Sequence, residues 1–146
     1  MTLADGTRRW GLYGAAGLLV RHVAPGDGQC SYFVALRSQL THMGGTWAVP
    51  GGALAHGETP VEAACREFRE EVGLALAPER VALVHEDDHG GWSYWTVVVD
   101  VGERFPLPTG VNWETSEVRW VSADELAALS LLPPFRATLT TLGFLP

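Results

Sequence analysis

The stretch that decides the fold is "GALAHGETPVEAACREFREEVGL", which spans residues 52–74. Within it, Thr59 is a favourable N-cap and Pro60 takes the first helical position, where its missing N–H costs nothing. Glu62 stands three residues after Thr59 and completes a capping box. The spacing therefore predicts a helix over residues 60–72.

One side of this helix is apolar. At about 100° per residue, five side chains point into one sector, which we expect to face the core. They are Val61, Ala64, Cys65, Phe68 and Val72. Gly73 follows directly, and glycine at this position is a common helix end. Capping and amphipathicity therefore indicate the same helix.

The carboxylates of the helix gather on the side that we expect to face away from the core. Glu67, Glu70 and Glu71 stand at i, i+3 and i+4, where like charges repel. The ordinary explanation of this carboxylate cluster is solvation, helped by an ion pair between Arg66 and Glu70. The preceding glycine-rich loop favours a ligand-binding role for the cluster instead, because the loop holds Glu58 near the positive end of the helix. Clustered oxygen ligands suit Mg²⁺ or Mn²⁺, which also bind phosphate oxygens. The sequence thus predicts a phosphate-handling metal site.

Composition limits the number of domains, the partners and the kinds of chemistry that we expect. The chain has 146 residues, of which 47% are hydrophobic and 18% charged, so we expect a single domain over residues 1–146. A net charge of −7 makes a nucleic-acid partner unfavourable. The chain contains no lysine, which excludes Schiff-base chemistry and lysine nucleophiles.

The cysteines and the amino-terminal segment predict a cytoplasmic protein. Cys30 and Cys65 are too few and too far apart for a disulfide framework or a zinc site, so we expect free thiols. Arg8 and Arg9 precede an apolar run, as in a twin-arginine export signal, but glycines interrupt the run. No apolar segment approaches the roughly 20 residues of a membrane helix. We therefore expect no membrane partner.

Apolar and β-branched runs predict strands on both sides of the central helix. We expect strands over 13–23, 31–36, 81–86, 92–101 and 118–121, and further helices over 123–129 and 135–142. Gly90 and Gly91 separate two strands as a hairpin turn would. Because hairpins follow the central helix, the order predicts an α/β layered domain with a mixed sheet.

The decisive stretch resembles the signature of the Nudix family, G-x5-E-x7-R-E-U-x-E-E-x-G-U, where U is a bulky apolar residue. Gly52, Glu58 and residues 66–74 agree with it at every defined position. The flanking "GGTWAVPGG" and the later "SEVRWVSADEL" are also similar to Nudix sequences. The resemblance implies an α/β/α sandwich and the metal-dependent hydrolysis of a nucleoside diphosphate linked to another moiety.

The resemblance also assigns roles to single residues. Glu67, Glu70 and Glu71 would bind Mg²⁺ or Mn²⁺. Arg66 would orient a glutamate of this set, and Glu58 would support the site from the loop. The cation would neutralise the diphosphate and acidify an attacking water.

Further groups are implied outside the helix. The carbonyl of Gly51 or Gly52 is expected to be another metal ligand. Family members often add an acidic residue from a later loop, for which Glu114 is our candidate and Glu117 the alternative. Either Glu67 or Glu114 would accept the proton of the attacking water.

The run "HEDDH", residues 85–89, satisfies the H-E-x-x-H pattern of zinc proteases, but its context does not. That pattern needs a helix to bring both histidines onto one face. Here strand-like runs flank the segment, two glycines follow it, and no later histidine supplies a third ligand. The sequence predicts a turn instead.

Four side chains are candidates for substrate contacts. In the strand that begins at Trp92, Trp95 alternates with three valines that we expect to face the core, so Trp92 and Tyr94 would lie on the other face. Trp47 precedes the signature and would also lie near the site. Arg37, at the end of a strand, would meet a phosphate or a base edge, with a solvated surface position as the ordinary alternative.

The choice among possible substrates rests on which subfamily marks the sequence lacks. The chain lacks the downstream marks of ADP-ribose and NADH hydrolases, and Tyr94 lies beyond the position typical of dinucleoside polyphosphate hydrolases. We expect a MutT-like enzyme that converts nucleoside triphosphates, including oxidised ones, to monophosphate and pyrophosphate. The alternatives are a non-catalytic nucleotide sensor, or a hydrolase of ADP-ribose, dinucleoside polyphosphates or RNA 5′ ends. The expected partner is a small nucleotide, and a homodimer is left open.

Overall fold

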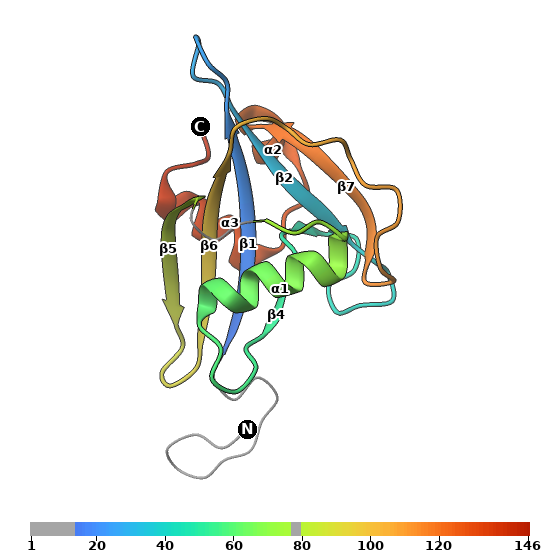
Figure 1. Ribbon diagram of the computed structural model, residues 1–146, viewed down its shortest axis with the longest axis vertical. Helices are drawn as coiled ribbons and strands as arrows, with labels where there is room; N and C mark the ends of the chain where they lie inside the picture. Colours follow the sequence, from blue (N-terminus) through green and yellow to red (C-terminus); the bar gives the residue numbers. More distant parts are fainter. Residues whose placement is uncertain (1–13, 77–79) are drawn as a thin grey trace.

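A computed structural model describes residues 14–76 and 80–146 of the chain. Its strands and helices alternate in groups along the sequence (Figure 1). They are β1 (Ala15–Val23), β2 (Cys30–Arg37), β3 (Trp47–Ala48), β4 (Gly51–Ala53), α1 (Pro60–Val72), β5 (Val81–Asp88), β6 (Ser93–Val101), β7 (Thr115–Ser122), α2 (Ala123–Ala128) and α3 (Pro133–Leu142). The predicted helix over 60–72 is therefore confirmed to the residue.

The strands form one mixed sheet. Its order is β3-β2-β1-β6-β5, with β4 paired to β1 and β7 paired to β2. Strands β1 and β6 run parallel, and the other described pairings are antiparallel. The predicted hairpin between β5 and β6 is present, and so is the predicted mixed sheet.

Helices cover both faces of this sheet. Helix α1 crosses one face, and α2 and α3 lie behind the other (Figure 1). On the α1 side, Phe68 packs against Phe33 of β2, with ring centroids 5.6 Å apart. On the opposite side, Leu126 of α2 and Leu139 of α3 pack in a cluster with Leu19 of β1. The predicted α/β/α sandwich is confirmed.

The central strands are buried on both faces. Residues 18–20 of β1 and 97–99 of β6 are all 0–1% exposed. In β6, the expected core face of Trp95 and the alternating valines does pack against α1. Val98 on the other face is just as buried, because the second helical layer covers it. The predicted core face of β6 is therefore confirmed, and the second helical layer buries the other face as well.

Two short strands went unpredicted. Strands β3 and β4 have two and three residues, too few to show a hydrophobic period. The other element ends differ from the predicted ones by no more than two residues, except that β7 begins three residues before its predicted start. The predicted start of the first strand at Tyr13 lies outside the described residues. The same is true of Arg8 and Arg9, which were weighed as part of an export signal.

The remaining structural expectations concern the "HEDDH" segment, the thiols and the membrane. Residues 85–88 belong to β5, so the turn predicted for this segment begins only after Asp88, where the His89 amide donates to the Trp92 carbonyl. The helix that a zinc-protease pattern requires is absent from this segment. Cys30 and Cys65 are free and half-buried. No helix in the described parts of the chain is long and apolar enough to cross a membrane.

Candidate active site

Helix α1 is capped at both ends, which fixes where its charged side chains point. Thr59 Oγ1 accepts a hydrogen bond from the Glu62 amide at 3.1 Å, and Glu62 Oε1 accepts one from the Thr59 amide at 2.9 Å. Gly73 ends the helix at φ 88°, in the left-handed region, and its N–H donates to the Arg69 carbonyl. The predicted capping box and terminal glycine are both present.

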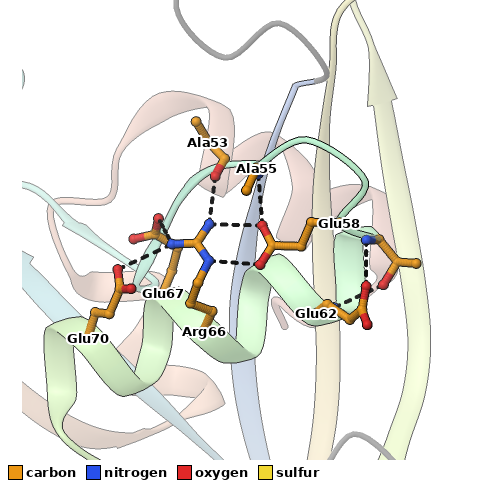
Figure 2. A network of polar contacts seen from close by, with 8 residues as sticks. Ala53, Ala55, Glu58, Glu62, Arg66, Glu67 and Glu70 are labelled. Atoms are coloured by element: carbon orange, nitrogen blue, oxygen red, sulfur yellow. Dashed lines mark hydrogen bonds and ion pairs between the residues drawn. The ribbon is translucent and has the colours of Figure 1, made fainter.

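The Arg66 guanidinium is the centre of the polar network on α1 (Figure 2). It donates two hydrogen bonds to the Glu58 carboxylate, at 2.8 and 2.9 Å. It also donates to Glu67 Oε2 at 2.9 Å and to Glu70 Oε1 at 3.2 Å. A further bond of 2.9 Å reaches the Ala53 carbonyl of β4. One cation thus compensates three carboxylates and ties the helix to the neighbouring strand.

These bonds change the proton affinities of both partners. The hydrogen bonds from Arg66 hold the pKa of Glu58 below its usual range, and the Ala55 amide adds another bond at 2.8 Å. Hydrogen bonding to Glu58 raises the pKa of Arg66 in turn. Both groups are therefore charged at neutral pH.

Glu71 differs from the other three carboxylates because it is only 7% exposed. The sequence placed Glu71 on the side away from the core, and in the structure β4 and the segment before β7 cover that flank of the helix. The Gly51 amide donates to Glu71 Oε2 at 3.1 Å, and the Asn112 amide donates to the Glu71 carbonyl at 3.1 Å. Burial, followed by repulsion from Glu114 and Glu67, raises the pKa of Glu71 to about 8.

Gly52 allows the β4 backbone to approach Glu67 closely. A Cβ atom added at Gly52 would lie 2.5 Å from Glu67 Oε2 and 2.6 Å from its carboxyl carbon. No side chain could therefore stand here without displacing the carboxylate. The absence of a side chain, rather than an unusual backbone angle, is the reason for glycine at this position.

Glu114 and Glu117 occupy different environments. Glu114 lines the same cavity as Glu71. Asn112 positions it, because Asn112 Oδ1 accepts a hydrogen bond from the Glu114 amide at 3.0 Å. Glu117 is half exposed and pairs with Arg119 at 2.8 Å. The geometry therefore favours Glu114 as the distal acidic residue of the site.

A small cavity of about 40 Å³ adjoins the carboxylates. Arg37 from β2, Gly51 from β4 and Thr115 from β7 line it together with Glu71 and Glu114. A cation and two carboxylates thus face one space. Such a site can hold an anion directly at the arginine, or through a divalent cation at the carboxylates.

Of the side chains predicted to contact a substrate, Arg37 lines this cavity, while two tryptophans are placed elsewhere. Trp47 is 7% exposed in the core cluster beneath α2 and α3, and the Arg119 guanidinium lies 4.7 Å from its ring centroid. The Trp92 ring lies near His89 at the β5–β6 hairpin, with centroids 6.1 Å apart. Their substrate contacts stay predictions.

Tyr94 lies behind the cavity wall. Its hydroxyl lies against the backbone of Gly17 and Gly51. A Cβ atom added at Gly17 would collide with the hydroxyl oxygen, and one added at Gly51 would lie 2.9 Å from it. Burial, followed by repulsion from Glu71, raises the pKa of Tyr94. The phenol is therefore protonated at neutral pH, and its predicted role in substrate binding stays a prediction.

Comparison with known proteins identifies the family. The model of the NUDIX domain matches residues 16–142. The chain belongs to the Nudix family. Residues 52–74, which carry the capped helix and its carboxylates, are the Nudix signature of this chain.

Several MutT-like relatives are similar to this Nudix chain. "Putative 8-oxo-dGTP diphosphatase 3" of Mycobacterium tuberculosis is 44% identical over 140 residues, covering 92% of this chain and 63% of the relative. An "8-oxo-dGTP diphosphatase" of Proteus vulgaris is 45% identical over 83 residues, covering 52% and 74%. The crystal structure of the Nudix hydrolase RenU from M. smegmatis is 41% identical, covers 97% of this chain and 89% of its own, and has a TM-score of 0.74. The chain thus spans less than two thirds of the M. tuberculosis relative.

Enzymes of the Nudix family typically use divalent metals. Within residues 14–76 and 80–146, no three carboxylate, imidazole or thiol side chains are grouped closely enough to hold one ion. Arg66 instead engages Glu67 and Glu70. The donor chemistry still suits a divalent cation, because the buried carboxylate of Glu71 lines one cavity with Glu114, and carboxylate oxygens are the ligands that such cations prefer.

Sequence reasoning missed two residues of this Nudix site. Asn112 joins the end of α1 to Glu114, and Thr115 lines the cavity. Asparagine is common in Pro/Gly-rich loops, and threonine is common at the start of a strand. Neither residue type therefore indicates a functional site by itself. Only the packing of β7 beside β2 shows that they reach the site.

Proposed function

We propose that this Nudix chain hydrolyses nucleoside triphosphates, including oxidised deoxynucleotides such as 8-oxo-dGTP, to a nucleoside monophosphate and pyrophosphate with Mg²⁺ or Mn²⁺. The observation that carries the proposal is the buried carboxylate of Glu71 beside Glu67 and Glu114, next to a cavity that contains Arg37. The names of the M. tuberculosis and P. vulgaris relatives support the choice of nucleotide. A cytoplasmic location stays a prediction of the sequence, and a homodimer stays open.

Each proposed role follows from a contact. Glu67, Glu70 and Glu71 would hold the cation, together with Glu114 and the backbone of Gly52. A bound cation would neutralise the diphosphate and acidify the attacking water. Glu70 is half exposed and reaches Arg66 only at 3.2 Å, so its carboxylate can turn away at small cost.

The remaining roles belong to groups around these carboxylates. Glu67 or Glu114 would accept the proton of the attacking water, because either carboxylate adjoins the site. Arg66 and Glu58 would keep Glu67 in place through their bidentate pair. Arg37 would contact the substrate from the cavity wall, and Trp47, Trp92 and Tyr94 remain candidates for contacts around it.

The proposal is tested with a panel of nucleotides. Wild-type protein should release monophosphate from dGTP or 8-oxo-dGTP with Mg²⁺ or Mn²⁺ and not with a chelator. Glu70→Gln and Glu71→Gln should each lower turnover by at least about a hundredfold while the protein stays folded, because each removes a charge that the cation requires. Turnover at the wild-type rate in either variant would contradict the assignment of that glutamate as a metal ligand.

Two further variants decide the distal carboxylate. Glu114→Gln should lose most of its activity, whereas Glu117→Gln should keep it, because Glu117 faces solvent and pairs with Arg119. ADP-ribose, a dinucleoside polyphosphate and 5′-triphosphorylated RNA complete the panel. Faster release from any of these would replace the proposed substrate, and nucleotide binding without turnover would indicate a sensor domain.

A further inference from the structure

The cavity beside Glu71 holds a threonine to which neither the signature nor the proposed roles assign any function. Thr115 is the first residue of β7 and stands opposite Arg37 of β2 in the antiparallel register. Both residues line the cavity, although Thr115 is only 8% exposed. Strands β2 and β7 lie side by side, and the end of α1 lies near the start of β7 (Figure 1). A buried hydroxyl and a guanidinium thus share one wall.

The Thr115 hydroxyl has no hydrogen-bond partner among the described residues, although the Thr115 amide donates to the Asn112 carbonyl. No unpartnered side-chain oxygen or nitrogen in the described chain is sealed from solvent. The exposed part of Thr115 therefore includes its hydroxyl, and Thr115 is one of the residues that line the cavity. Because this accessible hydroxyl has no partner in the described protein, it can form a hydrogen bond to a group that enters the cavity.

Arg37 is held in place while most of its donors stay unused. Its Nε donates to the His42 carbonyl at 2.9 Å, and its amide donates to the Thr46 carbonyl at 2.8 Å. Within the described parts of the chain, no carboxylate lies within ion-pair distance of its guanidinium. The terminal nitrogens therefore remain available to an acceptor in the cavity, and the single Nε bond limits their movement.

We propose that Thr115 and Arg37 form a subsite for a phosphoryl oxygen of the substrate, beside the carboxylates of Glu71 and Glu114. This inference rests on the proposed function, because it assumes a phosphate-bearing substrate. The cavity of about 40 Å³ is far smaller than the roughly 300 Å³ or more of a site that encloses a whole small molecule. It has room for a phosphoryl oxygen but not for a nucleobase. An arginine with an adjacent hydroxyl matches the charge and the acceptor geometry of that oxygen.

The first test is kinetic and uses Thr115→Val, which keeps the shape and removes the hydroxyl. We expect kcat/KM to fall by at least about tenfold, because a hydrogen bond to a charged group is lost. The factor should be the same for dGTP, dATP and dCTP, because the hydroxyl contacts phosphate and not the base. Thr115→Ser should restore most of the loss. Ser116→Ala, a change at the exposed neighbour in β7, is the matched control and should leave kcat/KM unchanged.

The second test measures binding without turnover. Inorganic pyrophosphate is titrated calorimetrically into wild-type protein, Thr115→Val and Thr115→Ser in the presence of Mn²⁺, with guanosine as the arm that lacks phosphate. We expect Thr115→Val to weaken pyrophosphate binding by about tenfold and to leave guanosine binding unchanged. The unfolding midpoint of each variant separates a lost contact from a lost fold.

The outcomes separate this subsite from the proposed function. Weakened pyrophosphate binding in Thr115→Val would support the subsite even if wild-type protein hydrolysed no nucleotide, a result that would refute only the proposed function. Hydrolysis by wild-type protein with unchanged kinetics and binding in Thr115→Val would overturn the subsite alone. A kinetic loss that differs between bases would place the hydroxyl against the nucleobase and overturn the phosphoryl assignment.

Discussion

At the scale of single residues, the site separates its carboxylates into two environments. Glu58, Glu67 and Glu70 share the Arg66 guanidinium, which compensates their charge. Glu71 pairs with no cation in the part of the chain that the structure describes, and its buried carboxylate accepts from the Gly51 amide instead. Its carboxylate is therefore the one whose ionisation the fold opposes most.

This difference predicts how stability depends on pH in the metal-free protein. In the folded state the pKa of Glu71 is about 8, against an ordinary value of 4.5. The stability from its bound proton is fully present below pH 4.5 and is lost as pH rises through about 8. We expect the free energy of unfolding to fall by about 2 kcal/mol between pH 6 and 8, measured by urea denaturation with a chelator present.

A control variant and a cation check the cause. Glu71→Gln has no proton to lose, so its stability should change much less over the same interval. Added Mn²⁺ should reduce the wild-type loss, because it favours the ionised carboxylate. Stability that rises with pH in the metal-free wild type would contradict the assignment of this proton to Glu71.

At the scale of elements, α1 and β4 work as a unit. The capping box fixes the start of the helix, and Arg66 joins the helix to the Ala53 carbonyl of β4. The carboxylates project from the helix toward a strand of three residues, whose glycines leave room for them. The first turn of α1 therefore positions groups that lie two turns further along.

Removing the cap should weaken this unit. Thr59→Ala deletes the acceptor of the Glu62 amide, and we expect the free energy of unfolding to fall by about 1 kcal/mol in urea denaturation. Thr141→Ala, the same change at an exposed position of α3, is the control and should stay within about 0.5 kcal/mol. Equal effects of the two substitutions would show that the cap contributes little.

At the scale of the whole molecule, β1, β4 and β6 meet at Gly17. A Cβ atom there would collide with the Tyr94 hydroxyl of β6 and would lie 2.9 Å from Val49 Cγ2 and 3.2 Å from the Pro50 carbonyl oxygen. The Tyr94 hydroxyl thus fits beside β1 and β4 because Gly17 and Gly51 have no side chains. The packing behind the cavity wall depends on this arrangement.

A double-mutant cycle tests this contact. Gly17→Ala should lower the free energy of unfolding by about 1–3 kcal/mol through overpacking, and Tyr94→Phe in the same chain should recover part of it. Gly44→Ala is the matched control, because its Cβ would lie 2.5 Å from the Ser38 carbonyl oxygen, a clash that the phenylalanine at residue 94 cannot relieve. Strictly additive effects of Gly17→Ala and Tyr94→Phe would rule out the contact.

Features that depend on residues close together along the chain could be predicted from the sequence. Helix α1, its capping box, its terminal glycine and the grouping of Glu67 with Glu70 all follow from spacing along one turn or two. The signature also indicated the family, because its defined positions are local. The mixed sheet followed from the order of strands and hairpins.

Only the tertiary structure decided which of these groups meet partners from distant parts of the chain. Burial of Glu71, the position of Glu114 beside it and the pairing of Arg37 with Thr115 join residues far apart in sequence. The periodicity of α1 placed Glu71 only on the side away from the apolar stripe, since a helix pattern records the helix alone and not the strand and loop that cover its flank. The charge and shape of the cavity are therefore properties of packing, which no single segment encodes.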